Sequence, residues 1–113
     1  MMLPGAERAV VDPAKVRDYL LSFEHPVGRS KARFFAALGF SRAAWPELRS
    51  ALLGLGREGN AEPGPASPFG QKYVVRGTIQ GPTGRTATIV TAWIVLAGED
   101  MPRFVTAYPA EAR

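Results

Sequence analysis

The sequence predicts an α+β fold in which N-terminal helices pack on a C-terminal antiparallel sheet. In the first half, apolar residues recur at i, i+3 and i+4, which is the spacing of an amphipathic helix. In the second half the spacing changes to alternation, which indicates half-buried strands. The short GPTG link between two of these strands cannot make a parallel crossover, so the sheet should be antiparallel.

The first helix is predicted to begin at Asp12 and Pro13. An Asp side chain can accept hydrogen bonds from free N–H groups at a helix start, and Pro is tolerated at the first helical position. The apolar face of this helix comprises Val16, Tyr19 and Leu20. His25-Pro26 should end the helix, because Pro disfavours helical geometry in the residue before it.

Two further helices are predicted before the spacing changes. The second should begin at Ser30 and end at Gly39, which fits a C-terminal cap, and the third should follow Ser41 as its N-cap. Their apolar faces comprise Phe34, Ala37 and Leu38 in the second helix and Trp45, Leu48, Leu52 and Leu55 in the third. Residues 57–70 are rich in Gly and Pro, which predicts an irregular loop.

The sheet is expected to have three to four strands between about residues 71 and 108. Strands are predicted at 72–80, 86–95 and 103–108, separated by turns at 81–84 and 98–100. The amphipathic helices should cover one face of this sheet. The predicted core comprises Tyr19, Leu20, Phe34, Leu38, Val75, Ile89 and Trp93.

Length and composition indicate one globular domain over residues 1–113, with its helical half at about 12–57. The absence of cysteine excludes a disulfide scaffold, a thiolate zinc site and a cysteine nucleophile. A single histidine excludes a multi-histidine metal site, and we expect no metal and no cofactor. No apolar run is long enough to span a bilayer and no secretory signal is recognisable, so we expect a cytoplasmic protein without a membrane partner.

The most unusual segment is EHPVGRSKAR, at residues 24–33. It contains the only histidine, His25, and three cations at alternate positions, Arg29, Lys31 and Arg33, where a helix is expected to begin. Free N–H groups, the helix dipole and the cations could there bind a phosphate. His25 could act as a general base or acid. The alternative is a solvated helix start with a capping histidine, in which Lys31 pairs with an acid such as Glu24.

The predicted strands add hydroxyl groups and aromatic rings to the candidates. Thr91 and Trp93 share one face of a strand by the two-residue period, and so do Thr106 and Tyr108. A catalytic role for Thr91 or Thr106 requires that its side chain point into the same groove as His25. Threonine is also a good strand former and Trp93 is a natural core residue, so a structural role is the alternative for both.

Several blocks of the sequence together resemble a known group of proteins. They are K-x-x-x-Y-L-L at 15–21, H-P-x-G-x-x-K-A-x-F-F at 25–35, L-G-F at 38–40, T-A-W-I at 91–94 and R-x-V-T-A at 103–107. Over about residues 3–109 the chain resembles a small bacterial domain of unknown function and the C-terminal toxin modules of contact-dependent inhibition and other polymorphic toxins. More distantly, it is similar to the ribonuclease fold of barnase, EndoU and the tRNA-cleaving colicins.

The resemblance implies a metal-independent toxin-type endoribonuclease, a hydrolase that cleaves RNA, with tRNA as a candidate substrate. By matching position it implies catalytic roles for His25, Lys31, Thr91 and Thr106. Trp93 falls in the same blocks as a candidate RNA contact, and Arg29, Arg33 and Tyr108 are added from the residues themselves. The predicted partners are RNA and a small antitoxin or immunity protein. The alternative is a non-catalytic binding module, either an inactive relative or the partner protein in a toxin–antitoxin pair.

Overall fold

The computed structural model describes residues 1–110 and confirms the α+β prediction, because three helices precede a four-stranded antiparallel sheet. The helical half comprises η1 (Ala6–Arg8), α1 (Pro13–Lys15), η2 (Val16–Leu20), α2 (Arg29–Ala37) and α3 (Trp45–Glu58). The sheet comprises β1 (Ala61–Ser67), β2 (Gly70–Gln80), β3 (Thr86–Leu96) and β4 (Pro102–Pro109). None of the helices in this described part has the length and apolar character that crossing a bilayer requires.

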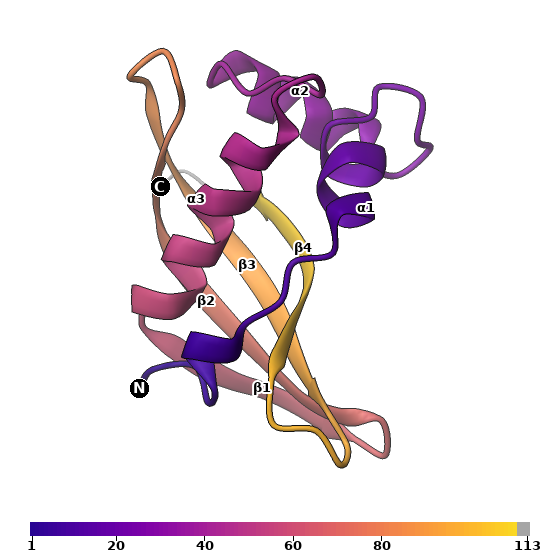
Figure 1. The fold of residues 1–113 in the computed structure, drawn as a ribbon, viewed down its shortest axis with the longest axis vertical. Helices are drawn as coiled ribbons and strands as arrows, with labels where there is room; N and C mark the ends of the chain where they lie inside the picture. The colour runs from indigo at the N-terminus through magenta and orange to yellow at the C-terminus, as the bar shows by residue number, and fades with distance from the viewer. Residues whose placement is uncertain (111–113) are drawn as a thin grey trace.

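The sheet is a meander in which each strand pairs with the next along the chain. Its register aligns residues in rows across the strands, and the row Val75, Thr91 and Ala107 is fully buried under the helical half. Figure 1 shows α3 lying over the sheet and α1 beside β4. The N-terminal segment also follows the outer edge of β4, where Val10 bridges to Arg103 in parallel.

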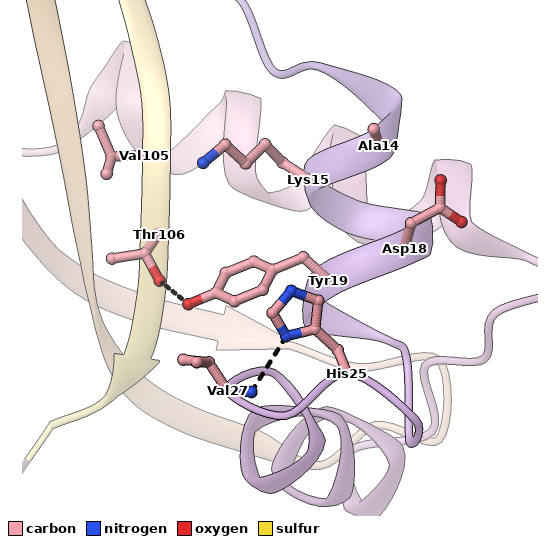
Figure 2. A pocket seen from close by; sticks show the side chains of 8 residues that line it. All are labelled: Ala14, Lys15, Asp18, Tyr19, His25, Val27, Val105 and Thr106. Atoms are coloured by element: carbon pink, nitrogen blue, oxygen red, sulfur yellow. Dashed lines mark hydrogen bonds between the residues drawn. The ribbon is translucent and has the colours of Figure 1, made fainter.

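The first predicted helix begins as expected but is wound differently. The Asp12 carboxylate accepts a hydrogen bond from the Ala14 N–H at 2.9 Å, and Pro13 is the first helical residue. After one α-helical turn the chain continues as the π-helix η2, with Leu21 N–H donating to the Val16 carbonyl. η2 ends at Leu20, before His25-Pro26, and it carries Tyr19 toward Thr106 on β4 (Figure 2).

The prediction of an irregular loop over residues 57–70 is wrong, because α3 continues to Glu58 and β1 occupies Ala61–Ser67. β1 is an edge strand, so one side of its backbone pairs with no other strand. Pro63 and Pro65 lack a backbone N–H, and an edge strand tolerates this loss. The pairing with β2 is also irregular between Pro63 and Ala66. The Gly and Pro content of this segment does favour a loop, but antiparallel pairing with β2 outweighs that preference.

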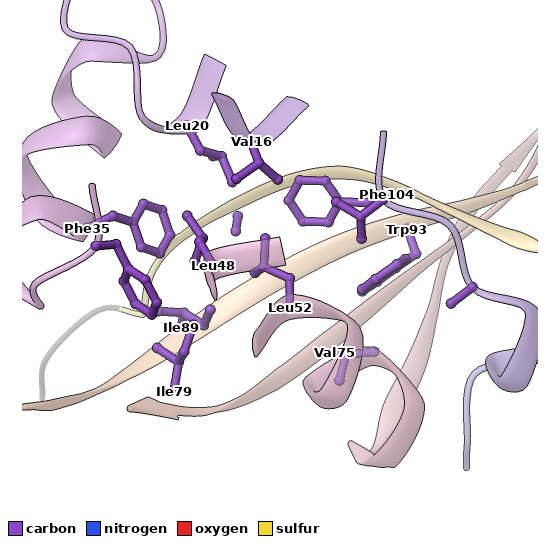
Figure 3. Close-up of a cluster of buried hydrophobic side chains, with 14 of the residues drawn as sticks. Val16, Leu20, Phe35, Leu48, Leu52, Val75, Ile79, Ile89, Trp93 and Phe104 are labelled. Carbon is purple, nitrogen blue, oxygen red and sulfur yellow. The ribbon is translucent and has the colours of Figure 1, made fainter. Parts of the chain in front are cut away.

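One core joins the helical half to the sheet (Figure 3). Trp93 is fully buried in it and meets Phe104 edge-on, with ring centroids 5.4 Å apart. Most of the predicted core residues are buried, but Tyr19 and Phe34 are only partly buried and pack on its border. Full burial of a large apolar side chain contributes about 1.5–3 kcal/mol to stability, so the fully buried Trp93 should contribute more than the partly buried residues at the border.

α3 approaches the sheet closely at Gly56, which is buried against the Trp93 ring. A Cβ at this position would lie 2.5 Å from Cζ2 of Trp93, closer than two carbon atoms can pack. Gly54, one half-turn away on the same helix, has no atom within 4 Å of the corresponding position. Sequence analysis could identify both glycines as weak points for a helix, but not that one of them sets the distance between helix and sheet.

We expect Gly56→Ala to lower the free energy of unfolding by about 1–3 kcal/mol, because the added methyl group overpacks the core against Trp93. Gly54→Ala is the matched control. It should leave stability unchanged or raise it by up to about 1 kcal/mol, because alanine is the better helix former and the site is open. Urea unfolding of both variants measures the difference, and equal stabilities would contradict the role given to Gly56.

Candidate anion-binding site around Tyr19

An open pocket of about 530 Å³ lies between η2, the loop after it and the edge strand β4. Figure 2 shows Lys15, Tyr19, His25 and Thr106 turned toward one another within it. Its lining comprises Ala14, Lys15, Asp18, Tyr19, His25, Val27, Val105 and Thr106. Lys15, Tyr19 and His25 come from the helical half, and they face the Thr106 hydroxyl of the sheet.

Tyr19 is the central residue of this pocket. Its hydroxyl is 3.0 Å from Oγ1 of Thr106, which joins two residues 87 positions apart in the chain. The π-helical turn changes the angle at which residue 19 leaves the helix, and such turns are common at functional sites. Sequence analysis placed Tyr19 in the core, so its role at the pocket was missed.

Two lysines approach the Tyr19 ring from different helices. The ammonium nitrogens of Lys15 and Lys31 lie 5.8 and 5.7 Å from the ring centroid, within the range of a cation–π interaction. Within residues 1–110 neither ammonium group pairs with a carboxylate, so the expected alternative of a Lys31–Glu24 pair is not found. Lys15 lines the pocket, and Lys31 adds a second positive charge beside the Tyr19 ring.

His25 caps the turn that leads into α2. Its Nδ1 accepts hydrogen bonds from the backbone N–H groups of Val27 at 3.1 Å and Gly28 at 3.0 Å. A neutral imidazole that accepts at Nδ1 carries its proton on Nε2, so this ring presents a hydrogen-bond donor rather than a base. The ring also meets Tyr19 edge-on at 5.1 Å. The capping role considered from the sequence is therefore confirmed.

Gly28 brings this turn close to Tyr19. A Cβ at residue 28 would collide with the Tyr19 carbonyl group, so only glycine permits the observed approach. The spacing H-P-x-G thus combines a capping histidine with a residue that lets the turn pack on η2. The position of the His25 ring beside Tyr19 follows from both contacts.

Asp18 supplies the one carboxylate in the pocket lining. It pairs with Arg17 at 2.8 Å and with Arg42 at 2.9 Å. Hydrogen bonds from Arg17 and then from Arg42 lower the pKa of Asp18 from 3.8 to about 2. The carboxylate is thus neutralised by two arginines, which limits its repulsion of an anion in the pocket.

Thr91 and Trp93 do not belong to this site, and their assignments as catalytic and RNA-binding residues are wrong. Both side chains are fully buried. The Trp93 indole N–H donates to Oγ1 of Thr91 at 2.8 Å, and that hydroxyl donates to the Val75 carbonyl at 2.8 Å. Because the two residues satisfy each other inside the core, neither can reach a ligand.

The three cations at alternate positions of residues 29–33 are separated by the helix. Residues two apart on a helix do not share a face, whereas residues four apart do. None of the three lines the pocket, but the Lys31 ammonium lies 5.7 Å from the centroid of the Tyr19 ring, while Arg29 and Arg33 are exposed. The expectation that all three bind one phosphate is therefore wrong. Tyr108 also lies outside this pocket, and it is 41% exposed on β4.

Lys15, Asp18 and Tyr19 are the pocket residues that sequence analysis missed. Lys15 and Tyr19 are four residues apart, a spacing that places side chains on one helix face, and both fall in the K-x-x-x-Y-L-L block, but neither signal assigned them to a site. Within residues 1–110, no group of three or more His, Asp or Glu side chains is arranged to hold a metal ion.

The fold and the pocket define a small α+β domain with an open depression bordered by lysines. The chain belongs to the family described as a domain of unknown function, DUF6883, which it matches over residues 2–111. No curated protein sequence matches it. A similar solved chain comes from a contact-dependent growth inhibition toxin–immunity protein complex of Klebsiella pneumoniae 342. The match has a TM-score of 0.71 at 17% identity and covers 96% of this chain and 98% of that chain, which establishes a shared fold.

Stability should depend on pH through Asp18. The pKa of Asp18 in the folded state lies below the usual value of 3.8. The ionised carboxylate therefore stabilises the fold fully above about pH 4, and this stabilisation is lost as the pH falls toward 2. Asp18→Asn should therefore be less stable than the wild type at neutral pH, and the difference should close near pH 2. Urea unfolding at both pH values measures this. A deficit of equal size at both would exclude the carboxylate charge as its cause.

His25→Ala should lower the free energy of unfolding by about 0.5–2 kcal/mol, because the Val27 and Gly28 N–H groups lose their acceptor. His25→Asn is the matched variant, since its side-chain oxygen lies near the position of Nδ1 and can accept the same bonds. Thermal and urea unfolding should place His25→Asn close to the wild type. If Asn destabilises as much as Ala, the capping role is not what His25 contributes.

Proposed function

We propose that this protein is a toxin-type endoribonuclease that cleaves RNA without a metal ion, at the pocket around Tyr19. The observation that carries the proposal is the convergence of Lys15, the His25 imidazole and the Tyr19–Thr106 hydroxyl pair on one open pocket, with the Lys31 ammonium beside the Tyr19 ring. The similarity in fold to a chain of a toxin–immunity complex supports a role in a toxin system.

A phosphate diester fits the charge and the donors of this pocket. Lys15 and Lys31 supply the positive charge, and the Nε2–H of His25 supplies a directed donor. Charge-assisted hydrogen bonds to phosphate are among the stronger interactions that a surface site can make. The pocket is open rather than enclosed, so its shape is compatible with a polymeric ligand.

The reaction would proceed by attack of a ribose 2′-oxygen on the adjacent phosphorus. The 2′-hydroxyl proton passes to Nε2 of His25, the P–O5′ bond breaks, and the 5′-oxygen takes a proton from the Tyr19 hydroxyl. The products are a 2′,3′-cyclic phosphate and a 5′-hydroxyl, and His25 returns the proton to Tyr19 through solvent. For this step His25 must carry its proton on Nδ1, so the turn at residues 25–28 must first release that nitrogen.

The second candidate is a non-catalytic binding module that pairs with a toxin or immunity partner. It is favoured by the same hydrogen bonds, because a histidine whose Nδ1 is held by two backbone N–H groups cannot accept a proton on Nε2. In this candidate the pocket binds an anionic group and no bond is broken. The two candidates therefore differ in whether residue 25 needs an imidazole at all.

The deciding experiment is incubation of the purified protein with total RNA in EDTA. The wild type should release fragments that end in 2′,3′-cyclic phosphate. His25→Asn should fold normally but lose about 10²–10⁴-fold in rate, because it keeps the cap and lacks Nε2. Lys31→Ala should keep its stability and lose about 10²-fold, since one charge that stabilises the transition state is removed.

The controls decide between the two candidates. Arg33→Ala removes an exposed charge from the same helix as Lys31, but Lys31 lies over the Tyr19 ring and Arg33 does not, so this variant should cleave like the wild type. Growth arrest on expression in bacteria, relieved by His25→Asn, would support the nuclease in cells. RNA that stays intact at a large excess of wild-type protein would eliminate the nuclease and leave the binding module.

A further inference from the structure

A second pocket of about 530 Å³ lies on the face of the sheet opposite the helical half. Its lining comprises Asn60, Glu62, Val74, Arg76, Val90 and Tyr108. In the sheet register, Arg76 pairs with Val90 and Val90 pairs with Tyr108, so these three residues cross the sheet in one row. We call this row, with the pocket around it, the open sheet face.

The open sheet face carries an arginine and an aromatic ring on either side of an apolar floor. Arg76 and Tyr108 are exposed, Tyr108 to 41%, while Val90 between them is only 9% exposed. Arg76 takes part in no ion pair within residues 1–110, so its charge is uncompensated by a direct partner. An exposed ring and an unpaired guanidinium group on the same sheet face, separated by one strand, can stack a base and bind a phosphate of the same nucleic-acid strand.

This face is continuous with the pocket around Tyr19. The neighbouring register row comprises Glu62, Val74, Ala92 and Thr106. Thr106 therefore belongs to the same side of β4 as Tyr108, and its hydroxyl is the one that contacts Tyr19. Two residues along a strand span about 6.6 Å, so the two pockets meet at the edge of β4.

We infer that the open sheet face is a second subsite for single-stranded RNA, in which a base stacks on Tyr108 and a phosphate binds Arg76. This inference rests on the proposed function, because it takes RNA as the ligand of the neighbouring pocket. A duplex cannot use the subsite, since its bases are already stacked on each other. The protein thus selects an unpaired strand that passes from the sheet face over the edge of β4 to Tyr19.

Glu62 provides a test of the sign of the ligand charge. Its carboxylate lines the same pocket, on the far side from β4. If a phosphate backbone crosses this face, removal of that negative charge should strengthen binding. Glu62→Gln should therefore bind RNA more tightly than the wild type at low salt.

The experiment measures binding of a fluorescent single-stranded RNA whose riboses are 2′-O-methylated and which therefore cannot be cleaved. Tyr108→Ala should bind at least about fivefold more weakly, while Tyr108→Phe, which keeps the ring, should bind like the wild type. Arg76→Ala should reduce the slope of log affinity against log salt by about 0.7, the value for one phosphate contact. The same sequence as a duplex should not distinguish Tyr108→Ala from the wild type.

Phe69→Ala is the matched control for an exposed aromatic residue. Phe69 is 77% exposed at the β1–β2 turn, roughly 20 Å along the sheet from Arg76, and its loss should leave RNA affinity unchanged. Equal affinity of Tyr108→Ala and the wild type for the single strand overturns the inference and leaves this face to a protein partner. Weaker binding by Tyr108→Ala supports it even if the wild type fails to cleave RNA, and cleavage without this effect supports only the nuclease.

Discussion

The close contact of α3 with the Trp93 ring is the constraint on which the rest of the structure depends. Gly56 has no side chain where a Cβ would collide with the Trp93 ring, and the buried indole N–H donates to Thr91. The Thr91 hydroxyl in turn donates to the Val75 carbonyl on β2, and within residues 1–110 every buried side-chain nitrogen or oxygen has a hydrogen-bond partner. Because of this close approach, one small core can hold the helical half on the sheet.

The same packing brings the N-terminal segment to the edge of β4. Val10 lies against β4 through the hydrogen bonds to Pro102 and Phe104, and the chain then enters α1 and η2 beside that strand. The Tyr19–Thr106 contact is a consequence of this path. A pocket built in this way lies between two halves of the chain, so it exists only when both are folded together.

Electrostatics divide the surface around Tyr19 into two parts. On one side the lysines are unpaired, and on the other Asp18 is held between Arg17 and Arg42. The arginines compensate the carboxylate and lower its pKa, so negative charge does not oppose the lysines. This division is the electrostatic basis of the proposed anion site, and it does not depend on whether the bound group is cleaved.

The sequence by itself determined the order of the elements and the buried face of most of them. Helical and alternating spacing of apolar residues is a local property, and it predicted α2, α3 and the strands β2, β3 and β4 at nearly their observed bounds. It also identified His25, Lys31 and Thr106, which meet around Tyr19. Patterns of this kind can be recognised from the sequence alone, because each depends on residues only a few positions apart.

Only the tertiary structure decided which of the candidates share a site. Residues 61–67 became a strand because β2 offers a pairing partner, although their Pro and Gly content favours a loop. Thr91 and Thr106 are both strand threonines, yet one faces the core and the other faces Tyr19. Thr91 pairs with Ala107, so Thr106, one residue away on β4, points to the opposite face of the sheet. Tyr19 was predicted in the core, but in the structure it follows a π-helical turn and lines the pocket. Pairing, register and close packing depend on residues far apart in the chain, and no local pattern contains them.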